Sequence, residues 1–156
     1  MILHLICDNS GSMMEGGKAF AMRNTVITIA QWLRIEETQM LIRLYRWAAV
    51  IQALPNWSDK DEFPMELLSG SGQCMGQSLI QMLGESPDGR ILILTDGLWS
   101  LQETRALKRW HESLPADTLR FIKIGADAHP QLKWANIFAA EELFAALDGW
   151  SERAET

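Results

Sequence analysis

Asp8, Ser10 and Ser12 follow one another at two-residue spacing in the stretch CDNSGS, residues 7–12. The apolar run before them, residues 2–7, predicts a buried strand that ends at the aspartate. A carboxylate and two hydroxyls at a strand end are the hard oxygen ligands that Mg²⁺ or Mn²⁺ prefers. The alternative is a polar loop whose side chains only satisfy N–H groups at the start of the next helix.

A second group of polar residues follows the apolar run RILIL, where Thr95 and Asp96 precede Gly97. A glycine-rich stretch, SGSGQ at residues 69–73, precedes a predicted helix. In an open parallel sheet, ligands bind beyond the carboxyl ends of the strands. We therefore expect the two aspartates and the hydroxyls to converge at one edge of the sheet.

The periodicity of apolar residues predicts the elements that would position these groups. Strands are expected over residues 2–7, 40–47, 49–54, 90–97, 119–125 and 136–140, and helices over 18–34, 73–83, 100–114 and 141–147. Ser100 is the expected N-cap of its helix, with Glu103 completing a capping box. Residues 55–72 read as a long loop with one helical turn. Alternating strands and helices predict a three-layer, doubly wound α/β fold with a mostly parallel sheet. The hairpin over 40–54 would supply one antiparallel edge strand.

Length and composition restrict the function classes. The 156 residues favour a single domain, residues 1–150, followed by a polar tail, 151–156. The net charge of −6 and the absence of a basic run argue against nucleic acid and against an anionic membrane surface as ligands. No apolar run has membrane-spanning length, and the N-terminus lacks the features of a secretory signal. With only two cysteines in the chain, we expect a cytoplasmic protein.

The two motifs also resemble a known family. DNSGS matches the D-x-S-x-S motif, and LTDG the third-loop motif, of the von Willebrand factor type A (VWA) domain. The similarity extends over residues 2–150 and includes IKIGADAHPQL and NIFAAEELFAAL. It implies a Rossmann-like fold with a metal-ion-dependent adhesion site (MIDAS). Ser10 and Ser12 would bind Mg²⁺ or Mn²⁺ directly, Asp8 and Asp96 would bind largely through water, and an Asp or Glu of a partner protein would complete the shell.

The second loop departs from the family pattern, which has a ligating threonine there. Placing Gln73 at the threonine position aligns the apolar residues of the following helix, so Gln73 is the expected replacement, and Ser71 is the alternative ligand. The sequence leaves open whether this change abolishes metal binding.

Other residues near the proposed site have two interpretations each. Met14 and Trp99 could contact a partner around the metal, as Met and aromatic residues do at protein interfaces, or belong to the core. Cys7 and Cys74 are expected to be small buried hydrophobes rather than a redox pair in which Cys74 has a lowered pKa. His4 is expected to be a hydrogen-bonded core histidine rather than a ligand.

The resemblance implies a protein-binding module rather than an enzyme. Small stand-alone bacterial domains of this type often act beside AAA+ ATPases of the MoxR type, which makes such an ATPase the expected assembly partner. One alternative is a Mg²⁺-dependent phosphoryl-transfer or hydrolase enzyme with Asp8 as nucleophile. However, Ser10 stands where haloacid-dehalogenase-type phosphatases need a second aspartate, and no lysine is placed by a motif. The other alternative is a metal-free, degenerate VWA scaffold.

Overall fold

The computed structural model describes residues 1–36, 39–125, 128 and 136–150. Its strands are β1 (Ile2–Asp8), β2 (Leu41–Trp47), β3 (Ile51–Ala53), β4 (Arg90–Thr95), β5 (Leu119–Lys123) and β6 (Ile137–Ala139). Its α-helices are α1 (Lys18–Ile35), α2 (Gly76–Leu83), α3 (Leu101–Ser113) and α4 (Leu143–Leu147). Short 3-10 turns occur at η1 (Gly11–Met14), η2 (Met65–Leu68) and η3 (Ala140–Glu142).

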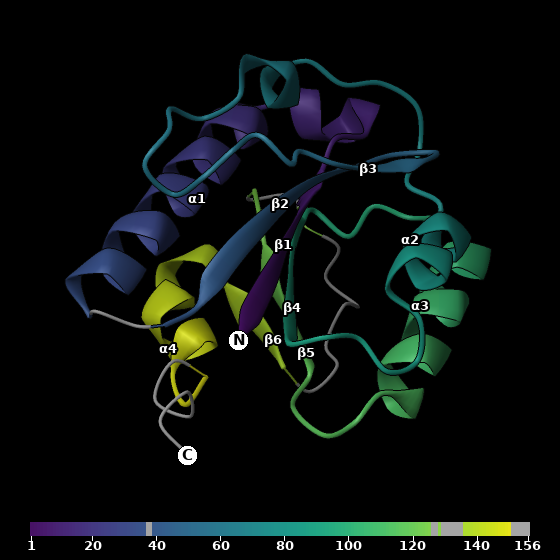
Figure 1. Ribbon diagram of the computed structural model, residues 1–156. Helices are drawn as coiled ribbons and strands as arrows, with labels where there is room; N and C mark the ends of the chain where they lie inside the picture. The colour runs from purple at the N-terminus through teal and green to yellow at the C-terminus, as the bar shows by residue number, and fades with distance from the viewer. Residues whose placement is uncertain (37–38, 126–127, 129–135, 151–156) are drawn as a thin grey trace.

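The strands form one sheet in the order β3-β2-β1-β4-β5-β6 (Figure 1). All neighbouring pairs are parallel except β2 and β3, which form the antiparallel edge hairpin. The chain runs outward from β1 through β2 to β3 and then crosses to β4 on the other side of β1. The sheet therefore has its topological switch point between β1 and β4, where doubly wound folds bind ligands. The predicted fold class is confirmed.

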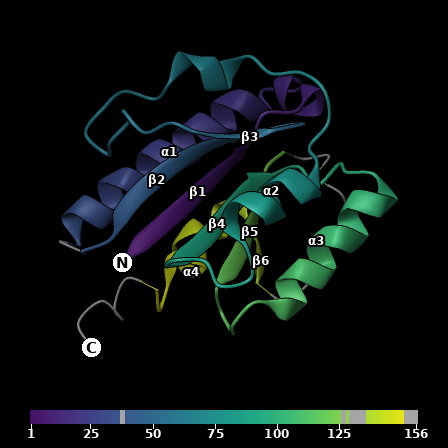
Figure 2. The same ribbon diagram turned by 45° about the vertical axis from the view of Figure 1, so that its right-hand side comes forward.

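Helices cover both faces of the sheet, with α1 and α4 on one face and α2 and α3 on the other (Figures 1 and 2). Alternate residues of the strands point to opposite faces. Leu3, Leu5 and Cys7 of β1 accordingly pack in the core beneath α1 and α4, while Ile6 packs with Leu79 of α2 and Leu107 of α3. The central strands are buried on both faces, which explains their nearly continuous apolar sequence.

The main differences from the predicted elements lie at helix ends. Helix α2 begins at Gly76 rather than at residue 73, so the glycine-rich loop extends three residues further. The predicted last helix is divided into the 3-10 turn η3 and the short helix α4. The helical turn expected in the loop 55–72 is η2. The predicted tail, 151–156, and most of the stretch 126–135 lie outside the described residues.

Glu103 takes a different partner from the one that the capping box requires. Ser100 caps α3 as predicted, since its hydroxyl accepts a hydrogen bond of 3.2 Å from the Glu103 amide. The Glu103 carboxylate accepts a hydrogen bond from the Gly76 amide at the start of α2. The residue therefore joins two helices on the same face of the sheet, a partnership that local sequence does not encode. Across the described ranges, no helix has the length and apolar character needed to cross a membrane.

His4 joins β1 to both of its neighbouring segments. Its Nδ1 lies 2.7 Å from the Tyr45 hydroxyl of β2, and its Nε2 lies 2.6 Å from the Asp88 carbonyl in the loop before β4. A neutral imidazole satisfies both contacts, because Nε2–H donates to the carbonyl while Nδ1 accepts from the hydroxyl. His4 is thus a buried, hydrogen-bonded core histidine, as predicted. Burial lowers its pKa below the ordinary value of 6.5, against the raising effect of the Asp88 hydrogen bond.

This pKa shift predicts a pH dependence of stability. The unfolded chain binds a proton at His4 at a higher pH than the folded chain does, so the free energy of unfolding should fall as the pH drops below 6.5. Urea denaturation between about pH 5 and pH 8 should show a shallower loss at acid pH in His4→Gln than in the wild type. The other titrating groups are common to both proteins, so identical slopes would exclude His4 as a source of the effect.

Candidate metal centre at the carboxyl edge of the sheet

The sheet register brings Asp8 and Thr95 together. In the pairing of β1 with β4, Cys7 lies opposite Leu94, so the next residues along these parallel strands are Asp8 and Thr95. Both side chains point to the face of the sheet that α2 and α3 cover. The Thr95 hydroxyl donates a hydrogen bond of 2.6 Å to Asp8 Oδ2. Thr95 thereby joins the ends of the two strands that flank the switch point.

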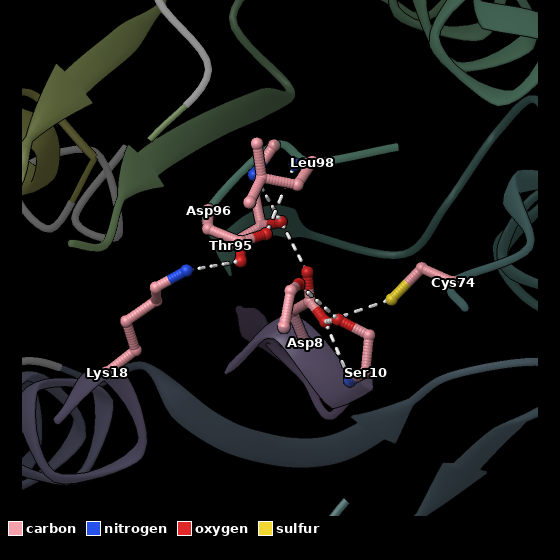
Figure 3. A network of polar contacts seen from close by, with 9 residues as sticks. Asp8, Ser10, Lys18, Cys74, Thr95, Asp96 and Leu98 are labelled. Carbon is pink, nitrogen blue, oxygen red and sulfur yellow. Dashed lines mark hydrogen bonds and ion pairs between the residues drawn. The ribbon is translucent and has the colours of Figure 1, made fainter. Parts of the chain in front are cut away.

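The Asp8 carboxylate is fully buried and accepts hydrogen bonds from three segments of the chain (Figure 3). Its Oδ1 accepts from the Ser10 amide at 2.9 Å, the Ser10 hydroxyl at 2.6 Å and the Cys74 thiol at 3.0 Å. Burial raises the pKa of Asp8, while the hydrogen bonds from Ser10, Thr95 and Cys74 oppose that rise because they stabilise the charged form.

The loop after β1 is fixed by Asn9. The Asn9 amide donates to the Trp47 carbonyl at 2.7 Å, and its side chain accepts from Arg46 Nε at 2.5 Å and donates to the Leu67 carbonyl at 3.2 Å. Gly70 passes so close that a Cβ there would lie 2.2 Å from the Asn9 carbonyl oxygen, which leaves room only for glycine. These contacts hold the loop between the end of β2 and the segment that contains η2.

Ser10 and Ser12 present two hydroxyls side by side. Their Oγ atoms are 3.2 Å apart. Neighbouring ligands of an octahedral Mg²⁺ ion, at bond lengths of about 2.1 Å, are separated by about 3 Å. The Ser10 hydroxyl donates its proton to Asp8, so Ser12 is the donor in the hydrogen bond between the two serines, and one lone pair of Ser10 remains for a cation. The spacing of the pair therefore fits two direct ligands of one hard cation.

Asp96 lies just past β4 and turns toward the face covered by α1. Its Oδ1 accepts a hydrogen bond of 3.1 Å from the Leu98 amide, and its Oδ2 forms an ion pair of 3.0 Å with Lys18 Nζ (Figure 3). Both side chains are almost completely buried, at 1% and 3% exposure respectively. The sequence analysis did not assign a lysine to this site. Lys18 lies in the first turn of α1, ten residues after Asp8, and it reaches Asp96 only through a tertiary contact that no motif indicates.

In the second loop, the residue that contacts the Asp8 carboxylate is Cys74. Gln73 and Ser71 have exposed side chains, whereas Cys74 is buried. Burial and then the Asp8 charge raise the pKa of the Cys74 thiol, and the same two causes raise that of Cys7. The alternative of a Cys74 with a lowered pKa is therefore wrong. Cys74 is a buried thiol, as predicted, but with a hydrogen bond that the sequence did not indicate.

Several apolar residues lie in the loops at the same edge of the sheet as the polar group. Met14 and Trp99 are both partly buried. The Trp99 ring packs at a tilt against two other rings, with its centroid 5.9 Å from that of Trp47 and 6.1 Å from that of Phe121. Val50, Met75 and Leu98, which the sequence analysis did not single out, are more exposed, at 71%, 40% and 43%. Val50 lies in the loop after β2, Met75 in the loop before α2 and Leu98 in the loop after β4, all at the carboxyl edge of the sheet.

The donor set fits a hard divalent cation in type. Two carboxylates and two adjacent hydroxyls provide oxygen ligands and close to the charge that Mg²⁺ or Mn²⁺ needs. Among the described residues, no three or more His, Cys, Asp or Glu side chains form a group that could hold a metal, at this edge or elsewhere, so the candidate site depends on the two serine hydroxyls. Two features of this site work against a cation. The ammonium group of Lys18 already neutralises Asp96, and the second loop directs no oxygen ligand inward, because Ser71 and Gln73 are exposed.

Comparison with known proteins shows the fold. No protein-family model and no curated protein sequence matches the chain. Among solved structures, the SpRpn10 VWA domain superimposes with a TM-score of 0.59 at 14% identity, over 92% of this chain and 93% of that one. A von Willebrand factor type A protein from Catenulispora acidiphila superimposes with a TM-score of 0.54 at 15% identity, over 78% of this chain and 32% of that one. BatB from Bacteroides thetaiotaomicron superimposes with a TM-score of 0.54 at 12% identity, over 79% of this chain and 66% of that one. The chain thus has the VWA fold, and it spans less than two thirds of two of these three proteins.

The Cys74–Asp8 hydrogen bond predicts unequal effects of two cysteine substitutions. Cys74→Val removes a donor from a buried carboxylate and should lower the free energy of unfolding by about 1–3 kcal/mol. Cys7→Val is a similar change within the apolar core and should cost less than about 1.5 kcal/mol. Cys74→Ser, which retains a donor, should recover part of the loss. Urea denaturation measures all three, and equal losses for Cys74→Val and Cys74→Ser would contradict a role for the hydrogen bond.

Proposed function

We propose that this chain is a protein-binding module with the VWA fold, which binds its partner through the carboxyl edge of the sheet. The observation that carries the proposal is the pair of hydroxyls 3.2 Å apart, Ser10 and Ser12, beside the buried Asp8 and Asp96 at the topological switch point. Ligand sites of doubly wound sheets occur at this point.

A Mg²⁺ or Mn²⁺ ion is the proposed cofactor. Ser10 and Ser12 would bind it directly, and Asp8 and Asp96 would bind it largely through water. An Asp or Glu of the partner would add the last oxygen, since hydroxyl ligands contribute no charge. The ion would supply the attraction for that carboxylate. From the second loop, Gln73 or Ser71 would add an oxygen only by turning inward, because both side chains are exposed.

The surroundings of the site suit a protein ligand. Val50, Met75 and Leu98 expose apolar surface in loops at the same edge of the sheet, and Met14 and Trp99 contribute their uncovered parts. Met and aromatic residues are enriched at protein interfaces. We therefore include Met14 and Trp99 among the proposed partner contacts. By the family resemblance, the proposed setting is a cytoplasmic assembly with an AAA+ ATPase of the MoxR type.

Two alternatives differ from this proposal in measurable ways. A phosphoryl-transfer or hydrolase enzyme would need Asp8 accessible to substrate, but the side chain is fully buried and both of its oxygens accept hydrogen bonds from the protein. Phosphoester turnover that disappears in Asp8→Asn would nevertheless favour that enzyme. A metal-free scaffold would bind its partner equally well in Mg²⁺ and in EDTA.

Calorimetric titration with Mg²⁺ and Mn²⁺ tests the metal site. Saturable binding is expected for the wild type, with affinity at least about tenfold lower in Ser12→Ala and lost in Asp8→Ala. Ser12 is the gentler substitution, because its side chain is only partly buried. The matched control is Ser86→Ala, because Ser86 is an exposed serine before the amino end of β4, and this variant should bind the metal as the wild type does.

The same variants test partner binding. A MoxR-type ATPase from the source genome should associate with the wild type and Ser86→Ala in Mg²⁺, release in EDTA, and associate poorly with Ser12→Ala. Absence of metal binding at millimolar concentration, with or without that ATPase, would overturn the metal-dependent mechanism.

A further inference from the structure

Lys18 occupies a position that ordinarily disfavours a lysine. It is the first residue of α1, where the helix dipole favours negative rather than positive charge, and the first turn contains no acidic residue. The side chain is also 3% exposed, and a buried ammonium group has a large desolvation cost unless it is paired. The ion pair with Asp96 offsets both effects, so the pairing holds Lys18 in the interior of the site.

The same pairing changes the charge that a metal would meet. Asp96 Oδ2, 3.0 Å from Lys18 Nζ, belongs to one of the two carboxylates proposed to attract the cation. While Lys18 is paired, one unit of that negative charge is already neutralised. A divalent ion bound nearby would also face repulsion from the ammonium group, and burial weakens the screening of that repulsion by water.

We infer that Lys18 is an internal cation that competes with the divalent metal for Asp96. In the metal-free form the ammonium group pairs with Asp96, and in the metal-loaded form it leaves Asp96 and becomes accessible to solvent. The inference rests on the proposed metal site and adds its regulation. Metal binding then requires that a buried ion pair breaks, and the exposure of Lys18 at the start of α1 differs between the metal-free and the metal-loaded form.

Mn²⁺ titration of two Lys18 variants tests the competition. Lys18→Met removes the charge while keeping the length of the side chain, and should bind Mn²⁺ at least tenfold more tightly than the wild type. Lys18→Arg keeps the charge and should stay within threefold of the wild type. Equal affinity in Lys18→Met and the wild type, or weaker affinity in Lys18→Met, would overturn the inference while leaving the proposed metal site intact. Absence of Mn²⁺ binding in both proteins would overturn the proposed metal site and the inference with it.

The wild-type protein provides a second test that does not depend on the folding of Lys18→Met. An amine-acetylating reagent, followed by mass spectrometry, measures the accessibility of each lysine. Lys18 should react at least fivefold faster with saturating Mn²⁺ than in EDTA, while the exposed Lys108 on α3 should react equally in both. Unchanged protection of Lys18 when calorimetry shows Mn²⁺ bound would overturn the inference.

Discussion

The carboxylate of Asp8 is the constraint on which the arrangement of the site depends. It is fully buried, and it is stabilised only because donors from the loop after β1, from the end of β4 and from the second loop all reach it. A buried carboxylate without such donors would be strongly destabilising. The requirement to satisfy Asp8 therefore fixes the relative positions of three segments of the chain. It also orients the Ser10 hydroxyl, which lies 3.2 Å from that of Ser12.

The two aspartates are stabilised in different ways. Asp8 is surrounded by neutral donors, namely hydroxyls, an amide and a thiol, whereas Asp96 is paired with the ammonium group of Lys18. The strand geometry accounts for the difference. Thr95 and Asp96 are consecutive, so they point to opposite faces of the sheet, one toward Asp8 and the other toward α1. The two aspartates thus face different layers of helices.

The binding face is built from loops that have little regular structure of their own. Their positions come from the ends of central strands that are buried on both sides, and from single polar contacts such as those of Asn9. A rigid sheet with loops at its carboxyl edge is a common way of holding recognition residues. The exposure of the apolar residues Val50, Met75 and Leu98 follows from the same arrangement, because each lies in a loop at that edge.

By itself, the sequence determined the α/β class, the central strands and the placement of Asp8, Ser10, Ser12 and Asp96 at the carboxyl edge of the sheet. Alternation and strand order are local or topological properties, so apolar periodicity and the rule for parallel sheets were sufficient to predict them. Tertiary structure decided which side chains complete the site. Cys74 rather than Gln73 contacts Asp8, since helix α2 begins three residues later than its apolar pattern indicates. Lys18 reaches Asp96 across 78 residues of sequence. No spacing rule encodes either contact, because each depends on how a helix packs against the finished sheet.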